Sequence, residues 1–337
     1  MSQPLGDPPG PPPLMQPAGT YRRQVPVSKL RPFLTPTEDV YVIAHMGIAH
    51  VPVESWELRI EGLVERPIRL DFHALVKGPS ATVQAVLECY GNPVEPDVPT
   101  RRVGNVLWRG APLWPLLQQA GLDGRATCVW LEAPDHGSFA GMASDRYIKD
   151  VPLEIVRERL VLLAWEMNGA PLSVEHGFPV RAVLPGFFGA NSVKWLSRIY
   201  VTDARPESLF TTKLYNRRVL VGGVERLEPV RDLDVHAVIV TPAEGDTLSP
   251  GRRTIEGWAW SAGPVERVEV STDGGTSWRE ARLEPRLDGY TWQRFVLDWT
   301  PPTAAAYELQ SRATDDRDRL QPAVGRNRIH TVTVTVA

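Results

Sequence analysis

The chain has 337 residues, of which 42% are hydrophobic and 23% are charged, and its formal net charge is −3. This composition is typical of a globular protein of about two domains, and the nearly balanced charge argues against nucleic acid as a partner. No run of about 18 apolar residues occurs, which excludes a membrane-spanning helix. The two cysteines, Cys89 and Cys128, exclude a disulfide scaffold and cannot alone form a tetrahedral zinc site.

Residues 1–38 begin with MSQPLGDPPGPPPLMQPAG and are predicted to form a Pro-rich arm. The segment lacks the basic and apolar regions of a signal peptide, so a cytoplasmic location is the default expectation. A periplasmic location is expected instead if the chain is a processed form.

Residues 39–205 mix strand and helix signals. The alternation in 56–64 predicts a strand, and the apolar spacing in 111–122, ended by a glycine, predicts a helix. A strand running into a short helix is predicted in 67–76. Further strands are predicted in three places: 126–134, 160–172 and 178–186. Because regular alternation of strand and helix is missing, we expect a mixed α+β domain.

Residues 206–235 are predicted to be a connecting segment, and 236–337 a second domain made almost only of strands. Asp273-Gly274-Gly275 between alternating runs indicates a hairpin. About six or seven strands at regular spacing predict an immunoglobulin-like sandwich. Tryptophans are expected to supply much of its core: Trp258, Trp260, Trp278, Trp292 and Trp299.

Cys89 ends an apolar run in the stretch AVLECYGNPVEP, directly before a turn signal. A free cysteine is most often inert packing, whereas the junction of a strand and a loop often carries a ligand site, so both interpretations stay open on spacing alone. Cys128 lies inside a β-rich run and is predicted to be a core residue. No cysteine- or carboxylate-rich stretch lies near His45 and His50 in sequence, which argues against a metal site.

A second group of polar residues lies in the stretch LLAWEMNGAPLSVEHGFPVRAVLPGFFGANSVKWLSRIYV: His176, Arg181, Asn191, Ser192 and Lys194. Its cations and glycine-containing turn are suited to an anionic group such as a phosphate, or else they form a solvated surface loop. Arg181 stands within an apolar run, where an unpaired charge is costly. It therefore requires an anion, either a carboxylate of the protein or a ligand.

The first 35 residues of that stretch resemble the molybdopterin-binding core of the sulfite oxidase family. The segments ESWELRIEGLVERPIRL, LECYGN, NVLWRGAPLWPLL and GWAWSAGPVERVEVSTDGGTSW resemble other parts of the same family, in the same order. The resemblance runs from residue 40 to the end. It implies a molybdenum–molybdopterin cofactor and a C-terminal dimerisation domain, and so a homodimer.

The resemblance also implies roles for single residues. Cys89 matches the cysteine whose thiolate binds molybdenum, and Tyr147 the active-site tyrosine; the alternative for Tyr147 is an ordinary half-buried strand residue. Positions that match residues binding or contacting the cofactor are His45, Asp135, His176, Arg181, Ser192 and Lys194. A soft thiolate suits a metal that pterin sulfurs already hold.

Two departures concern the substrate. Ile43 and Pro93 stand where sulfite-oxidising members carry arginines, which help to hold a dianion. Arg101, Arg102 or Arg109 from the following loop are the candidates to replace them. We expect no added haem domain, and we therefore expect electrons to leave to an external carrier.

Together these features predict an enzyme that transfers an oxygen atom, oxidising sulfite to sulfate. The alternative is an oxotransferase on another small oxyanion or sulfoxide, of the sulfoxide or nitrate reductase type, which a less cationic pocket favours. A third hypothesis is a non-catalytic molybdopterin-fold binding protein, and the presence of Cys89 argues against it.

Overall fold

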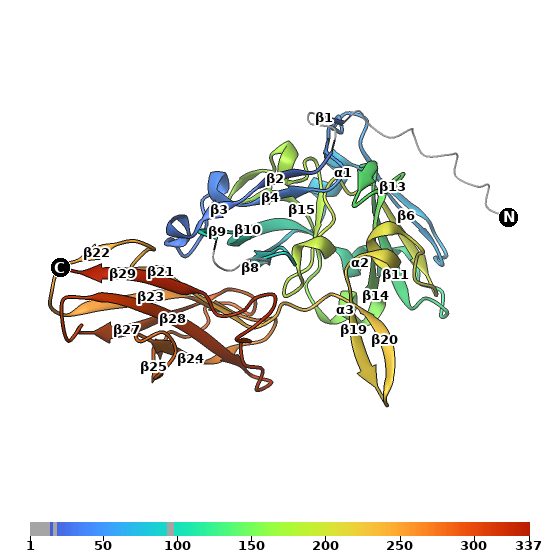
Figure 1. Ribbon diagram of the computed structural model, residues 1–337. Coiled ribbons are helices and arrows are strands. Elements are labelled where there is room, and N and C mark those ends of the chain that lie inside the picture. The colour runs from blue at the N-terminus through green and yellow to red at the C-terminus, as the bar shows by residue number, and fades with distance from the viewer. Residues whose placement is uncertain (1–13, 16–18, 93–97) are drawn as a thin grey trace.

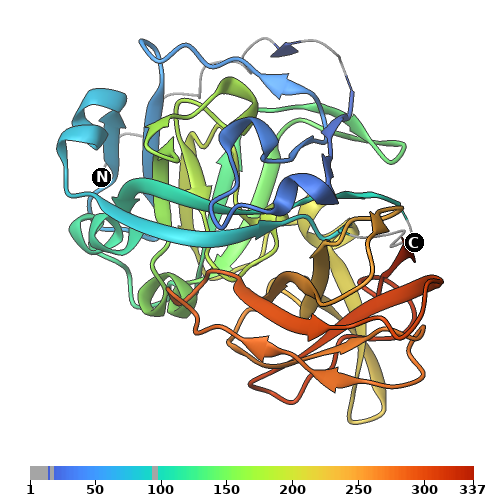
Figure 2. The ribbon, with the colours of Figure 1, turned by 90° about the vertical axis from the view of Figure 1, so that its left-hand side faces the viewer.

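The computed structural model describes residues 14–15, 19–92 and 98–337 (Figure 1). An N-terminal body and a C-terminal body lie side by side, and the chain passes once from the first to the second (Figures 1 and 2). Strands dominate the described residues, and the α-helices among them are short: α1 (Phe72–Lys77), α2 (Leu113–Ala120) and α3 (Leu153–Glu158). The fold is therefore mostly β with few helices, and it shows only part of the predicted α+β mixture. None of the helices in the described ranges is long and apolar enough to cross a membrane.

Two five-stranded sheets form the N-terminal body. One has the order β16-β15-β10-β8, with β17 also paired to β15; its strands are β8 (Ala81–Glu88), β10 (Val103–Pro112), β15 (Leu162–Met167), β16 (Ala170–Pro171) and β17 (Arg181–Val183). The other has the order β14-β11-β18-β6-β7, with β6 (Glu57–Gly62), β7 (Ile68–Asp71), β11 (Cys128–Ala133), β14 (Tyr147–Pro152) and β18 (Arg198–Thr202). Only β6 and β18 pair in parallel among these strands.

Local sequence explains the ends of the predicted helices. Asp71 caps α1 because its carboxylate accepts a 2.7 Å hydrogen bond from the backbone N–H of Ala74. Gly121 follows α2 with φ +71°, a conformation that favours glycine. Buried residues of the two sheets, such as Ile60, Val129 and Leu163, share one apolar cluster, and removing this surface from water holds the sheets together.

The predicted Pro-rich arm is part of the fold from residue 19 onward. β2 (Tyr21–Arg23) pairs with β4 (Val42–Ala44), and β3 (Val25–Pro26) pairs with β9 (Thr100–Arg101). The other short elements of this body are β1 (Leu14–Met15), β5 (Ile48–Ala49), β12 (Gly137–Phe139), β13 (Met142–Ser144), and 3-10 turns at Val27–Leu30, Thr37–Asp39, Val174–His176 and Gly189–Asn191. Backbone pairing thus fixes a segment that its proline content did not predict to be ordered.

The predicted connecting segment, residues 206–235, is likewise structured. A π-helical turn (Leu209–Lys213) precedes a hairpin of β19 (Asn216–Val221) and β20 (Val224–Pro229), which projects from the body (Figure 1). Gly222 and Gly223 both have positive φ, as a tight hairpin turn between twisted strands requires. The sequence carried this Gly-Gly signal between two alternating runs.

Two facing sheets build the C-terminal body. One has the order β21-β23-β27-β26 and the other β22-β29-β28-β24-β25. Their strands are β21 (His236–Thr241), β22 (Thr247–Leu248), β23 (Arg253–Trp260), β24 (Val265–Ser271), β25 (Arg279–Glu280), β26 (Arg282–Leu283), β27 (Gln293–Trp299), β28 (Ala306–Asp315) and β29 (Thr331–Val336). Gly274 and Gly275 turn the chain between β24 and β25, which confirms the predicted hairpin.

Four of the five tryptophans predicted for this core divide between two clusters, and the partly buried Trp278 belongs to neither. Trp299 lies in the apolar cluster between the two sheets, but Trp258, Trp260 and Trp292 belong to a cluster that they share with the N-terminal body. The indole of Trp260 donates a 2.8 Å hydrogen bond to Glu88, and that of Trp292 a 2.9 Å bond to the Phe33 carbonyl. The prediction was therefore wrong for these three, because alternation along a strand gives the buried face and not what covers it.

Candidate active site

A cavity in the N-terminal body collects the residues that the sequence marked for cofactor binding and catalysis. It is lined by the whole predicted set: His45, Cys89, Asp135, Tyr147, His176, Arg181, Ser192 and Lys194. These residues come from strands of both five-stranded sheets, from loops beside these sheets and, for His45, from the turn between β4 and β5. Ile43 also lines the cavity, whereas Pro93 lies outside the described residues.

Cys89 directly follows β8, and its backbone holds it at the cavity wall. Its N–H donates to the Arg102 carbonyl at 2.9 Å, and the Gly91 N–H donates to its sulfur at 3.4 Å. Burial raises the pKa of the Cys89 thiol, against smaller lowering effects of the Gly91 hydrogen bond and of Arg102. A bound metal cation would favour the thiolate over the thiol, so the position suits a metal ligand.

Arg181 and Lys194 bring two cations into the same cavity without an acidic ion-pair partner among the described residues. Arg181 donates to the carbonyls of His176 and Ser192, both at 3.0 Å, while its Nε is buried and has no hydrogen-bond partner. Lys194 Nζ donates to the carbonyls of Ile43 and Glu175 at 2.9 and 3.0 Å. Backbone oxygens therefore satisfy part of the need for an anion that the sequence indicated.

The electrostatics of this group favour an anionic ligand. Burial, aided by Arg181, lowers the pKa of Lys194 to about 7, and burial lowers that of Arg181 to about 10. His176 is affected in the same way, because burial and the two cations lower its pKa to about 2. Its Nδ1 lies 2.9 Å from the Ser173 hydroxyl, but its Nε2 is buried without a partner. Unpaired donors and poorly compensated positive charge fit the phosphate of a pterin cofactor.

Asp135 is buried in the loop after β11, and this burial raises its pKa to about 7, with Lys194 opposing the shift. Tyr147, the first residue of β14, donates from its hydroxyl to the Ala190 carbonyl at 2.7 Å. Burial raises the pKa of Tyr147 well above its ordinary value, so the phenol keeps its proton. Its ring stacks on Phe210 with centroids 4.3 Å apart.

Sequence reasoning missed Tyr215 and Tyr41, which also line the cavity. The hydroxyl of Tyr215 lies 2.6 Å from Nε2 of His45. Tyr215 stands in the segment that was predicted to be only a connection, and no local pattern marks it. The nearest signal is the Gly-Gly hairpin that follows, since it indicates that this segment forms regular secondary structure and is not merely a linker.

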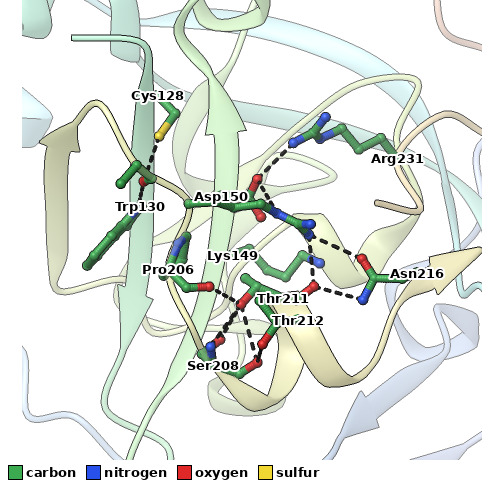
Figure 3. A network of polar contacts seen from close by, with 12 residues as sticks. Cys128, Trp130, Lys149, Asp150, Pro206, Ser208, Thr211, Thr212, Asn216 and Arg231 are labelled. Carbon is green, nitrogen blue, oxygen red and sulfur yellow. Dashed lines mark hydrogen bonds and ion pairs between the residues drawn. The ribbon is translucent and has the colours of Figure 1, made fainter. Parts of the chain in front are cut away.

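A polar network holds residues 205–231, here called the Tyr215 segment, against β14 (Figure 3). The buried carboxylate of Asp150 accepts hydrogen bonds from Arg205 at 3.0 Å and Arg231 at 2.8 Å. Arg205 and Asn216 each donate to the Thr211 carbonyl at 2.8 Å, and in β14 Lys149 donates to the Phe210 carbonyl at 2.8 Å. The network thus fixes residues on both sides of Tyr215.

The arginines considered as replacements lie in different surroundings. Arg101 is fully buried and donates to the carbonyls of Val98 and Thr100, outside the cavity lining. Arg102 donates to the Gly91 carbonyl at 3.1 Å, and its charge lowers the pKa of Cys89. Arg109 pairs with Glu166 at 3.5 Å on the outer face of β10. Arg102 is therefore the one of the three that acts on the site.

Cys128 is not the core residue that the sequence predicted. It is only partly buried, and its thiol donates to the Ala204 carbonyl at 3.1 Å at the start of β11. The position at a strand end explains its exposure, since a β-rich run does not show where its strand begins.

Comparison with known proteins gives a consistent picture. Residues 45–210 match the model of the oxidoreductase molybdopterin binding domain, and residues 228–336 that of the Mo-co oxidoreductase dimerisation domain. Sulfite oxidase of Gallus gallus is 33% identical over 86% of this chain and 68% of its own length. An NADH nitrate reductase of Cichorium intybus is 31% identical over 90% of this chain and 37% of its own length.

Among solved structures, the sulfane dehydrogenase SoxCD from Paracoccus pantotrophus is similar with a TM-score of 0.79 and 29% identity, covering 95% of this chain and 86% of that one. The chain spans between 37% and 68% of the length of these and other curated relatives that it matches. The matched domains, the identity to sulfite oxidases and the fold agree, and the chain belongs to the sulfite oxidase family of molybdopterin-binding oxidoreductases.

Proposed function

We propose that this protein is a molybdenum-dependent oxidoreductase that oxidises sulfite to sulfate and passes the electrons to an external carrier. The observation that carries the proposal is the single cavity that joins the Cys89 thiol to the buried cations Arg181 and Lys194. Membership of the family supports oxygen-atom transfer in general, and the identity to sulfite oxidases supports sulfite as the substrate.

In this proposal, different residues of the cavity have different roles. Arg181, Lys194 and the free Nε2 of His176 would bind the phosphate of the cofactor, with Ser192 beside them. Asp135 lies within the field of Lys194 and would accept from the pterin ring. Cys89 would be the protein ligand to molybdenum. When bound, the cofactor supplies two-electron redox chemistry coupled to the transfer of an oxygen atom.

The aromatic wall would orient the substrate and exclude bulk water. Tyr147 stays protonated and offers a neutral hydroxyl, and His45 is a neutral imidazole because burial and nearby cations lower its pKa to about 3. Phe210 packs against both rings, with centroids 4.3 Å from Tyr147 and 5.3 Å from His45. Preorganised neutral dipoles in a site of low dielectric stabilise charge that develops during a reaction without accepting a proton.

A second candidate is oxygen-atom transfer with a different small substrate. Ile43 favours it, since this apolar side chain lines the cavity where the resemblance leads us to expect an arginine. Nitrate is one such substrate, given the similarity to a nitrate reductase, and sulfane sulfur is another, given the similarity to a sulfane dehydrogenase.

The matched dimerisation domain also supports a homodimer, which the molar mass in solution would test.

The decisive experiment is a steady-state assay with the protein purified from a host that makes the cofactor. We expect about one molybdenum per chain and turnover of sulfite with an artificial one-electron acceptor. A molybdenum-replete sample without sulfite turnover would exclude the first candidate. Reduction of nitrate by a reduced dye, or oxidation of a sulfane substrate, would then identify the second. A protein that takes up no molybdenum would favour a binding module.

A further inference from the structure

The cavity has a cationic neighbour that the sequence did not mark. In the antiparallel pair of β2 and β4, Arg22 lies directly opposite Ile43. Directly opposed residues of a strand pair project to the same face of the sheet. Ile43 is partly exposed, whereas its neighbours Val42 and Ala44 are buried although all three line the cavity, so Arg22 lies with the Ile43 side chain on the more open face of this strand pair.

The Arg22 side chain is exposed and makes no hydrogen bond or ion pair with any residue that the structure describes. Its neighbour Arg23 differs, since it pairs with Glu175 at 2.7 Å and donates to the Val40 carbonyl at 3.1 Å. The charge of Arg22 nevertheless reaches the site, because it lowers the pKa of both His45 and Tyr215. Both residues are in the cavity lining and only partly buried, so Arg22 borders the open side of the cavity.

Arg102 supplies a second cation from another element. Its Nη1 donates to the Gly91 carbonyl at 3.1 Å, and its Nε is buried without a hydrogen-bond partner in the described part of the chain. Its charge acts on Cys89 and on Tyr215. Tyr215 is therefore the residue on which both guanidinium groups act, and its hydroxyl already faces His45 at 2.6 Å.

We propose that Arg22 and Arg102, together with the Tyr215 hydroxyl, form the subsite that binds a small oxyanion substrate. Guanidinium groups bind oxyanions through paired N–H donors, and cations at the rim of a cavity raise the local concentration of anions. Arg22 thus supplies from β2 the charge that Ile43 does not carry. It stands outside the matched residues 45–210, so this chain recruits a strand beyond the cofactor domain. The inference rests on the proposed function and narrows its substrate class to oxyanions.

The test compares the cofactor-loaded wild type with Arg22→Ala, Arg22→Lys and Arg31→Ala. Arg31 is an exposed arginine of the same N-terminal segment that is not in the cavity lining and, unlike Arg22, does not act on His45 or Tyr215, so its variant removes the same charge elsewhere. We expect the KM for sulfite to rise about tenfold in Arg22→Ala with kcat changed less than about twofold, and Arg22→Lys to recover part of the loss. Arg31→Ala should keep the wild-type KM.

A binding measurement separates this inference from the proposed function. Calorimetric titration of each cofactor-loaded protein with sulfate, used as the probe anion, should show about tenfold weaker binding in Arg22→Ala alone. If the wild type turns over no sulfite and this difference remains, the subsite holds and the proposed substrate is wrong. If sulfite is turned over with equal KM in wild type and Arg22→Ala, or if the wild type binds no sulfate, the subsite is wrong.

Discussion

The hydroxyl of Tyr215 lies 2.6 Å from Nε2 of His45, although the two residues stand 170 positions apart in the chain. Their rings meet edge to face, with centroids 5.8 Å apart and planes at 82°. Because burial and the cations nearby lower the pKa of His45 to about 3, the imidazole is neutral at physiological pH. The bond therefore joins two neutral groups, and it connects the Tyr215 segment to the wall of the cavity.

Replacing Tyr215 by phenylalanine should keep the ring and remove this hydrogen bond. The ring contacts with Tyr90 and Phe210 would remain, whereas His45 and the substrate anion would each lose a polar partner. We expect kcat/KM to fall about tenfold, which corresponds to about 1.4 kcal/mol. Tyr307→Phe is the matched control, since among the described residues that hydroxyl bonds only the exposed Thr303, and Tyr307 is outside the cavity lining. Equal kcat/KM in wild type and Tyr215→Phe would contradict the role.

The two cysteines provide a paired test of the metal ligand. Cys89→Ser should abolish turnover and lower the molybdenum content, because a serine hydroxyl is a harder and far less acidic ligand than a thiol. Cys128→Ser should keep both, since its thiol lies outside the cavity and bonds the Ala204 carbonyl. Metal analysis and steady-state rates on the same samples measure the effect. Normal molybdenum content and turnover in Cys89→Ser would show that another residue holds the metal.

The resemblance to the family predicted the cavity residues as a set, and local signals in the sequence marked only some of them. Arg181 in an apolar run and Cys89 at a strand end each break a pattern that packing alone would impose, and the structure places both in one cavity. Likewise, the glycine after α2 and the Asp273-Gly274-Gly275 turn determine the backbone conformation only of the few residues around them.

Tyr215 and Arg22 were not predictable, because their contribution arises from contacts between distant parts of the chain. Arg22 matters through the register of β2 against β4, and a shift of one residue would turn it to the other face. Trp258 packs against the N-terminal body for the same kind of reason. Such contacts depend on how sheets pack against one another, and the hydrophobic pattern along a single strand carries no information about that packing.

Asp150 should anchor the Tyr215 segment, so its loss should affect both stability and activity. Asp150→Asn would leave Arg205 and Arg231 without their shared carboxylate. Since these arginines are partly exposed and remain solvated, we expect the free energy of unfolding to drop by about 1–3 kcal/mol, less than for a fully buried pair. Asp145→Asn is the control, because Asp145 is 80% exposed. Chemical denaturation gives the stability, and a change no larger than that of the control would show that Asp150 is no anchor.

Lys194 should make the stability of the cofactor-free protein depend on pH. Its pKa is lowered from 10.5 to about 7, mainly by burial and then by Arg181. Below pH 7 both the folded and the unfolded chain carry the proton, and the cost of the buried charge is fully present. Between about pH 7 and 10.5 the folded chain loses this proton while the unfolded chain keeps it, so the free energy of unfolding rises with pH by up to about 1.4 kcal/mol per unit.

Lys194→Met should remove this contribution, so that its stability rises less steeply from pH 7 to 9 than that of the wild type. Lys77→Met, at the exposed end of α1, should keep the wild-type slope. Loading the wild type with the cofactor should also flatten the curve, because a bound phosphate pairs with Lys194 and raises its pKa again. Urea denaturation at several pH values measures the slopes. Identical slopes for wild type and Lys194→Met would show that the pKa of Lys194 is not lowered in the cofactor-free protein.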